Sequence, residues 1–243
     1  MNRSKSRHFF CATIALLGID LTITACKEPP RSSKYGEDVA TVADKLAMRF
    51  VATANMYGLE EPWVWEKNPD ACQTTIALGQ VGSMVKTTTG AHGLSYTGFD
   101  PLFQKYEACS GMSWKVLKAL AKMESELNPN AQNKSTGHVG LFQISQKMCY
   151  ATLADYGLQE RCTDLTNPET GVIYASIHLS AAMKTIEAAD CQIDRDELLY
   201  FLYISFGYGE GFLADLLKEA KCDRAQTKKA MMHVWQKRFG GNR

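Results

Sequence analysis

The chain has 243 residues, of which 45% are hydrophobic and 22% are charged. This balance is ordinary for a globular protein and excludes a wholly disordered chain. The formal net charge is +1 and there is no long run of Lys or Arg. Nucleic acid is therefore not expected as the main partner, because binding to phosphates requires a basic surface. The length favours one domain, or one domain with an extension.

The N-terminus has the pattern of a signal peptide. A basic segment, MNRSKSRH, precedes a short apolar segment, FFCATIALLGIDLTITA, that ends in small residues. The apolar segment is short and interrupted by Asp20, so it does not predict a membrane-spanning helix. Residues 23–26, ITAC, resemble a bacterial lipobox, in which Cys26 would be lipidated after cleavage. We predict a signal peptide over residues 1–25 and a lipid anchor on Cys26, with simple secretion as the alternative.

The residue after Cys26 indicates in which membrane the mature protein would be located. Asp at that place is the usual signal for retention in the inner membrane, and this chain has Lys27. We therefore expect a bacterial lipoprotein on the periplasmic face of the outer membrane. The polar segment 26–38, which contains Pro-Pro, reads as a tether between the lipid and the fold.

The cysteine content also favours export. Once Cys11 and Cys26 are assigned to the signal peptide and the anchor, six remain, and an even number in an exported chain indicates disulfides. We expect pairing in sequence order, because each pair then closes a local loop; buried free thiols are the alternative. The six are Cys72, Cys109, Cys149, Cys162, Cys191 and Cys222. No CxxC occurs and the histidines lack zinc-site spacing, so we expect no metal and no cofactor.

The mature chain divides into two parts by pattern. Apolar residues recur at intervals of three and four over 39–57, which predicts a helix, and residues 58–100 are rich in Gly, Thr and Ser. We treat 39–100 as an N-terminal helical extension and 101–243 as the main domain. No internal repeat is visible.

The main domain is predicted to be mainly helical. An amphipathic helix spans Ser113 to Leu127, with Ser113 as the N-cap and Pro129 beyond its end. Residues 195–206 are nearly all apolar after the first turn, which predicts a buried helix at the centre of a bundle. No sustained strand is expected, and short strands could lie in the 130–145 loop. The other predicted helices are 146–156, 168–188, 210–220 and 224–237.

One carboxylate in this pattern points to acid catalysis. Trp114, Leu117, Ala121 and Glu124 share one helix face at three-and-four spacing. Glu124 would therefore enter a partly apolar environment, where desolvation raises a carboxyl pKa and suits the group to act as a general acid. Glu126 lies about 200° further round the helix and cannot pair with it.

The motifs around Glu124 resemble those of soluble lytic transglycosylases and goose-type lysozymes. The family has a helix ending in Glu-Ser, then Asn-Pro-x-Ala, a polar loop and Gly-Leu-x-Gln-Ile. This chain has Glu124-Ser125, Asn128-Pro129-Asn130-Ala131 and Gly140-Leu141-Phe142-Gln143-Ile144. A second block, Leu165 to Thr170, precedes a helix that carries His178-Leu179, and a third, Phe206 to Gly209, stands where the family has Tyr-Asn-Ala-Gly-x-Gly. Together these cover about residues 104–215.

The resemblance implies a lysozyme-like fold, mainly α with a small loop/β region beside an active-site groove. It also implies cleavage of the β-1,4 bond between N-acetylmuramic acid and N-acetylglucosamine in peptidoglycan. Glu124 would protonate the departing oxygen, and the muramic 6-hydroxyl would attack C1 to give a 1,6-anhydro end. One carboxylate would then suffice, unlike in two-carboxylate glycosidases.

Polar side chains near Glu124 are the candidates for binding the glycan. Their amide and hydroxyl groups could bond sugar hydroxyls and acetamides, although Asn and Ser in such a loop can equally be turn formers. The candidates are Ser125, Asn133, Ser135, Gln143 and Tyr208.

The chain departs from the family pattern where a tyrosine usually supports the catalytic carboxylate. Ile204-Ser205 stands at Tyr-Asn, and Tyr203 is one residue off, about 100° round a helix. A shift in register, replacement by Tyr208, or a differently tuned site would each account for this. Gly171 stands where the family often has Asn, so the preference for acetylated or de-N-acetylated glycan stays open.

Two alternatives to a transglycosylase remain at this point. A hydrolysing lysozyme on the same scaffold would need a second carboxylate, and Asp155, Asp164 or Glu210 could serve. A non-catalytic peptidoglycan-binding protein would need none. In each case the expected partner is the glycan strand, with a monomer as the expected state.

Overall fold

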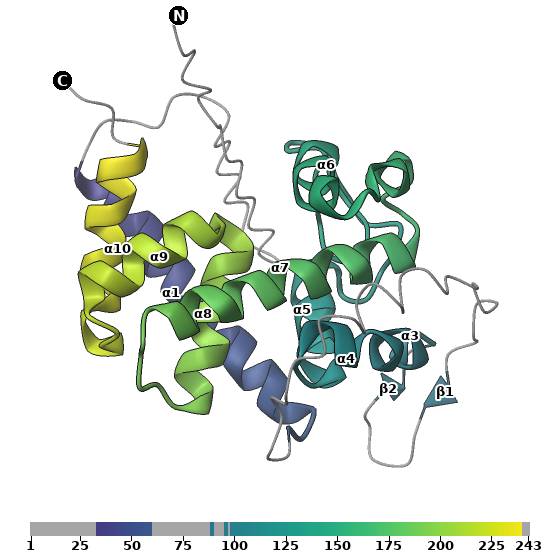
Figure 1. The fold of residues 1–243 in the computed structure, drawn as a ribbon, viewed down its shortest axis with the longest axis horizontal. Coiled ribbons are helices and arrows are strands. Elements are labelled where there is room, and N and C mark those ends of the chain that lie inside the picture. The colour runs from purple at the N-terminus through teal and green to yellow at the C-terminus, as the bar shows by residue number, and fades with distance from the viewer. Residues whose placement is uncertain (1–32, 60–87, 90–94, 97, 240–243) are drawn as a thin grey trace, which may run out of the picture.

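The computed structural model of the chain describes residues 33–59, 88–89, 95–96 and 98–239 (Figure 1). Helices dominate, and the described strands form two short antiparallel hairpins. The helices are α1 Ser33–Met56, α3 Asp100–Lys105, α4 Glu107–Ser110, α5 Trp114–Ser125, α6 Gln146–Leu153, α7 Pro168–Ala188, α8 Arg195–Tyr208, α9 Glu210–Ala220 and α10 Arg224–Phe239, with 3-10 helices η1 Ala154–Tyr156 and η2 Gln159–Thr163. The strands are β1 Thr88–Thr89, β2 Ser95–Tyr96, β3 Gln132–Asn133 and β4 His138–Val139.

The predicted helices after residue 112 are all confirmed, and the fold is mainly helical as expected. The predicted cap Ser113 accepts a hydrogen bond from a backbone N–H of the first turn of α5, and the side chains of Asn167 and Asp194 do the same at the starts of α7 and α8. The short helices α3 and α4 were not predicted individually, because six and four residues are too few to show a helical period.

Helix α1 belongs to the same core as the rest of the chain. It begins at Ser33, inside the segment expected to be a tether, and packs against α5, α8 and α10. Ala40, Ala43, Ala47 and Ala54 are buried at helical spacing, and Phe50 is fully buried among them. Small side chains on one face of α1 let the other helices approach closely. In Figure 1, α1 passes behind α8.

Two helices share the centre of the molecule. The predicted central helix is found as α8, with Leu199 to Leu202 fully buried. Helix α7 is equally central: it is buried continuously from Glu169 to Leu179 and contacts α3, α4, α5, α6, α8 and α9. In Figure 1 it runs between the α8–α10 side and the side that carries α3 to α6.

The loop between α5 and α6 is held in one conformation by backbone bonds. Helix α5 ends because Glu126 and Leu127 both take left-handed φ angles, 56° and 64°, and the Leu127 N–H returns to the Ala121 carbonyl. Gly140 has φ +83°, and a Cβ there would lie 2.1 Å from the Leu165 carbonyl oxygen. Only glycine therefore fits where the loop crosses the segment before α7.

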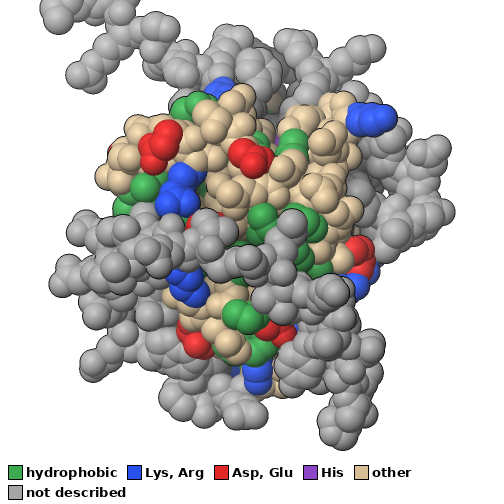
Figure 2. Space-filling model, turned by 90° about the vertical axis from the view of Figure 1, so that its right-hand side faces the viewer, with side chains coloured by type: hydrophobic (Ala, Val, Ile, Leu, Met, Phe, Trp, Pro, Cys, Tyr) green, Lys and Arg blue, Asp and Glu red, His purple; other side chains and the backbone are tan. Residues whose placement is uncertain are grey.

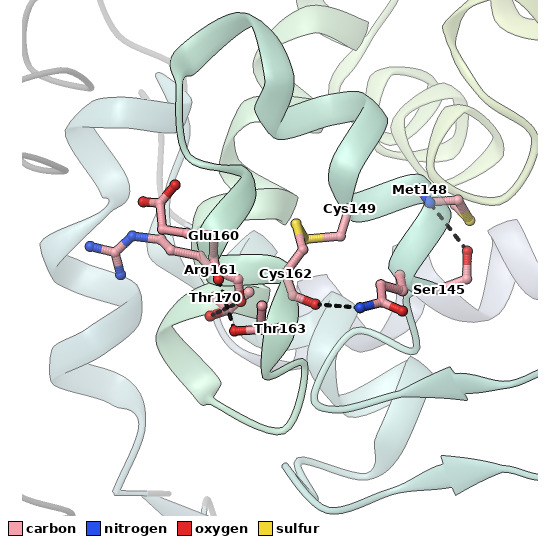
Figure 3. The surroundings of a disulfide bond; sticks show 9 residues. Ser145, Met148, Cys149, Glu160, Arg161, Cys162, Thr163 and Thr170 are labelled. Atoms are coloured by element: carbon pink, nitrogen blue, oxygen red, sulfur yellow. Dashed lines mark hydrogen bonds between the residues drawn. A yellow bond between two sulfur atoms is a disulfide. The ribbon is translucent and has the colours of Figure 1, made fainter.

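Two of the three predicted disulfides are confirmed. Cys149–Cys162 joins α6 to η2 (Figure 3), where Gln146 Nε2 also donates to the Cys162 carbonyl at 3.4 Å. Cys191–Cys222 joins the α7–α8 connection to the α9–α10 connection. Cys72 lies outside the described residues, so the Cys72–Cys109 pair stays a prediction, as do the signal peptide and the lipidation of Cys26.

The described part of the chain holds no helix long and apolar enough to cross a membrane. Figure 2 looks onto the end of the molecule that carries α3 and α6. Described hydrophobic side chains gather near the centre of this view, and acidic and basic side chains lie around them.

Candidate active site

Glu124 lies where the sequence placed it, one residue before the end of α5. Leu117 and Ala121, on the same helix face, are fully buried, and Trp114 packs against the core at the start of the helix. Glu124 is half-buried. Its surroundings desolvate the carboxyl strongly, and part of its surface still stays accessible.

The environment of Glu124 favours its protonated form. Burial raises the pKa of this carboxyl to about 8, from an ordinary value of 4.5. Within the described residues no side chain forms a hydrogen bond or an ion pair with it that would offset this cost. At neutral pH Glu124 therefore carries a proton that it can donate.

Glu126 has a different environment, as the helical geometry predicted. It is exposed and forms an ion pair with Lys122, one turn earlier on α5. The two glutamates do not share a proton or a site, so Glu126 serves as a matched control for Glu124.

The structure brings Tyr203, on α8, close to Glu124. The Glu124 charge contributes to raising the pKa of the phenol after the larger effect of burial, and the charge of Arg49 lowers it. The ring of Tyr203 stacks on Phe50 of α1, with centroids 5.3 Å apart. Tyr203 therefore lies near enough for the Glu124 charge to affect its phenol, although it is one residue off the family position.

Tyr208, one of the predicted glycan-binding residues, is surrounded by aromatic side chains. It is buried at the end of α8, with its ring 5.0 Å from that of Phe212 and 5.9 Å from that of Trp235. The Glu124 charge affects the pKa of the Tyr203 phenol, which agrees with a shift in register; it also affects the pKa of Tyr174. Tyr208 itself adjoins Tyr203, as their electrostatic coupling shows.

Ser125 and Gln143 hold the loop between α5 and α6 in place. Ser125 Oγ is 2.8 Å from the Leu141 carbonyl and 3.1 Å from the Ala121 carbonyl. Gln143 has φ 47°, and its Nε2 donates to the carbonyls of Ala131 at 3.1 Å and Gly140 at 3.0 Å. Both N–H groups of this amide are thus engaged, which leaves its carbonyl oxygen as the group available to a ligand.

Asn133 and Ser135 form a turn. Asn133 Oδ1 accepts hydrogen bonds from the backbone N–H of Ser135 at 3.1 Å and from its hydroxyl at 2.7 Å. This turn caps the β3–β4 hairpin, where Asn133 pairs with His138. The turn-forming role weighed for these residues is therefore present, and the Asn133 Nδ2 group faces no described acceptor.

The three candidate second carboxylates are not equivalent. Asp155 is exposed in η1, and Asp164 is exposed and accepts from Thr166 Oγ1 at 2.6 Å, a hydrogen bond that lowers the Asp164 pKa. Glu210, at the start of α9, has its pKa raised by burial. Tyr174, which is fully buried, feels the charges of both Glu210 and Glu124, so Glu210 is the candidate that shares a neighbour with the catalytic acid.

The contribution of α1 was missed by sequence reasoning. Phe50 supports Tyr203, Arg49 is near enough to alter the pKa of that tyrosine, and Thr53 Oγ1 lies 3.7 Å from the sulfur of Met123. The helical pattern was visible, but nothing in it indicated that this helix packs beside α5. Among the described residues no cluster of His, Cys, Asp and Glu could hold a metal ion.

Comparisons with known proteins identify relatives of this site. The family model for the transglycosylase SLT domain matches residues 101–229. A protein of Yersinia enterocolitica named membrane-bound lytic murein transglycosylase F is 30% identical over 148 residues, which cover 59% of this chain and 28% of that protein. Its namesake in Serratia proteamaculans is 28% identical over 172 residues, 67% of this chain and 32% of that protein. The chain thus spans about a third or less of these relatives. No solved structure gave a significant match.

Proposed function

Because the chain belongs to the transglycosylase SLT domain family, we propose that it is a lytic transglycosylase that cleaves the β-1,4 bond between N-acetylmuramic acid and N-acetylglucosamine in peptidoglycan. The observation that carries the proposal is the state of Glu124. It ends the family's Glu-Ser helix, it is half-buried, and its pKa of about 8 keeps it protonated at neutral pH. The relatives named as murein transglycosylases support the same substrate class.

In the proposed reaction Glu124 acts first as acid and then as base. Its proton goes to the glycosidic oxygen as the bond from that oxygen to C1 of the muramoyl residue breaks. The muramoyl 6-hydroxyl forms a new bond to C1 and gives its proton to the Glu124 carboxylate. Atoms balance without water, and the carboxyl is restored for the next cycle. One carboxylate is sufficient for this route because the nucleophile belongs to the substrate.

Neighbouring groups have definite tasks in this proposal. Tyr203 would position the glutamate and stabilise its charged form once the proton has left, since the Glu124 charge reaches its phenol. The Gln143 carbonyl oxygen and the Asn133 amide nitrogen would contact the sugar, because their other polar atoms are already bonded to the loop. Ser125 would act mainly by fixing the helix end to the Leu141 carbonyl.

Glu210 supports a second candidate function, a hydrolytic muramidase. Its carboxyl neighbours Tyr174, as Glu124 does, and could activate a water molecule if one entered the site. The products separate the two routes. Hydrolysis leaves reducing ends that take oxygen from water, whereas the transglycosylase route leaves 1,6-anhydromuramoyl ends.

The test is mass spectrometry of the muropeptides released from purified sacculi in ¹⁸O-labelled water. We expect anhydro ends without label from the native chain, no release by Glu124→Gln, and unchanged release by Glu126→Gln. Labelled reducing ends that disappear in Glu210→Gln would instead establish the muramidase. Equal release by the native chain and Glu124→Gln would overturn both.

We also propose attachment to the membrane through Cys26, with the chain facing the periplasm. The lipobox-like ITAC sequence supports this, and the printed names of the relatives describe membrane-bound enzymes. Cys26→Ser should move the protein from the membrane to the soluble fraction of a host cell. Unchanged fractionation would contradict a lipid anchor.

A further inference from the structure

An exposed stripe of α1 runs beside the catalytic end of α5. Arg49, Thr53 and Met56 follow one another at helical spacing, and all lie outside the segment 101–229 that the family model matches. Arg49 is exposed and Met56 is 74% exposed, while Thr53 between them reaches Met123, the neighbour of Glu124. This stripe is therefore a candidate wall for the bound glycan strand.

The stripe places a positive charge next to the site. The ring of Phe50 stacks on that of Tyr203, with centroids 5.3 Å apart. Arg49 directly precedes Phe50 in the same turn of α1. Arg49 and Glu124 have opposite effects on the pKa of Tyr203, so both charged groups lie near that phenol.

The guanidinium of Arg49 is not committed to a partner in the described part of the chain. No ion pair and no side-chain hydrogen bond engages it there; only its backbone carbonyl is used, as the acceptor for Thr53 Oγ1. Asp44, the acidic residue one turn earlier, instead accepts from the hydroxyl of Tyr200 at 3.0 Å. An unpaired guanidinium near an active site is available to bind an anionic part of the substrate.

We propose that Arg49 binds a carboxylate of the muramoyl residue and so determines specificity for muramic acid over a neutral sugar. This inference rests on the proposed function. The sugars of the strand are otherwise uncharged, and muramic acid carries a lactyl group on the same ring as the C1 atom that reacts. That group ends in a free carboxylate on peptide-free strands and carries an acidic stem peptide on others. A guanidinium binds either carboxylate through two parallel N–H groups.

The test measures binding by the full chain carrying Glu124→Gln, which prevents turnover. Calorimetry would compare three oligosaccharides of equal length: a neutral chitin oligomer, a peptide-free peptidoglycan oligomer and a peptide-bearing one. Arg49→Gln should weaken binding of a carboxylate-bearing oligomer about tenfold, equivalent to ~1.4 kcal/mol, and leave chitin binding within about twofold. The difference should shrink at high salt, because an exposed ion pair is screened.

The pattern of losses identifies the carboxylate. A loss on the peptide-free oligomer alone assigns the lactyl carboxylate, a loss on the peptide-bearing oligomer alone assigns the stem peptide, and a loss on both assigns both. Arg49→Lys should restore part of the affinity. Lys228→Gln, which removes an exposed charge from α10, is the matched control and should bind all three oligomers as the parent does.

An equal loss on all three oligomers, or no loss on any, overturns the inference. Thermal unfolding of each variant shows whether the fold is intact, which is expected because Arg49 is exposed. Failure of the proposed function is a separate result: the native chain would then release no anhydro ends, whatever the selectivity of Arg49→Gln.

Discussion

Two glutamates at helix ends, Glu169 and Glu124, have pKa values that are shifted in opposite directions. Glu169 lies in the first turn of α7 and is 5% exposed; Glu124 lies in the last turn of α5 and is half-buried. Burial by itself acts to raise the pKa of both carboxyls. For Glu169 the hydrogen bonds from Lys105 and Tyr106 and the charges of Lys105 and Arg161 outweigh burial, and its pKa falls below the ordinary value.

The partners of Glu169 come from α3, from the residue between α3 and α4, and from η2. Oε1 lies 2.8 Å from Lys105 Nζ and 2.7 Å from the Tyr106 hydroxyl, and Oε2 lies 3.5 Å from Arg161 Nη1. The N-terminus of α7 adds a favourable dipole, whereas the C-terminus of α5 offers none to Glu124. Hydrogen-bonding and charged partners, rather than depth of burial, therefore decide whether a buried carboxyl is ionised and stabilises the fold or stays protonated.

The largest expected effect separates the chemical role from the structural one. Glu124→Gln should lower the rate of muropeptide release at least about a thousandfold, ~4 kcal/mol of transition-state stabilisation, because an amide cannot donate the proton. The melting temperature should not fall, since Gln removes a carboxyl that nothing stabilises. Release rates with Glu126→Gln as control check this, and a residual rate above a tenth of the native rate would contradict it.

Glu169→Gln should give the converse result. It leaves Lys105 and Arg161 without their carboxylate in a buried setting, so we expect a loss of about 3 kcal/mol in unfolding free energy. Urea unfolding at neutral pH measures this, and Glu160→Gln, an exposed carboxylate in η2, is the control. Because the folded pKa of Glu169 is depressed, its contribution is present above pH 4.5 and is lost as the pH falls through the folded pKa. Equal stability of the two variants would mean that the cluster contributes nothing.

Tyr203→Phe tests whether the Tyr203 hydroxyl supports Glu124 in the proposed reaction. Loss of a hydroxyl beside the charged form of Glu124 should lower kcat about tenfold, ~1.4 kcal/mol. The native rate should fall as the pH rises through about 8, where Glu124 loses its proton. In the variant this limb should move to higher pH, because the carboxylate is less stabilised. A pH–rate profile identical to that of the native chain would exclude a positioning role.

The smallest expected effect concerns the stability cost of Glu124. The pKa of Glu124 is raised in the folded state, so the native chain loses stability as the pH rises from 4.5 to about 8. Above about pH 8 this contribution no longer changes with pH. Glu124→Gln lacks this loss. The variant should therefore exceed the native chain in unfolding free energy by about 1 kcal/mol more at pH 9 than at pH 5, a figure kept low because the group is partly exposed. The same shift with Glu126→Gln would show that the effect is not specific.

Much of this molecule could be predicted from local patterns. The helix around Glu124, its Ser113 cap and the bounds of α7 and α9 follow from apolar spacing and from cap and proline positions, which act within a few residues. The pairings Cys149–Cys162 and Cys191–Cys222 followed from closing local loops. The short helices and the exact place of α7 at the centre did not, because neither has a local signal of its own.

Local sequence patterns thus determined the helix that carries Glu124 and the polar loop that follows, since these depend on neighbours along the chain; the role of Glu124 as the acid stays a prediction. Only the tertiary structure decided that α8 brings the Tyr203 phenol within reach of the Glu124 charge, that α1 brings Phe50 and Arg49 near that phenol, and that the pKa of Glu169 is lowered while that of Glu124 is raised. The physical reason is that charge, stacking and desolvation depend on which helices pack together, and residues on those helices can lie far apart in the sequence, as Phe50 and Tyr203 do.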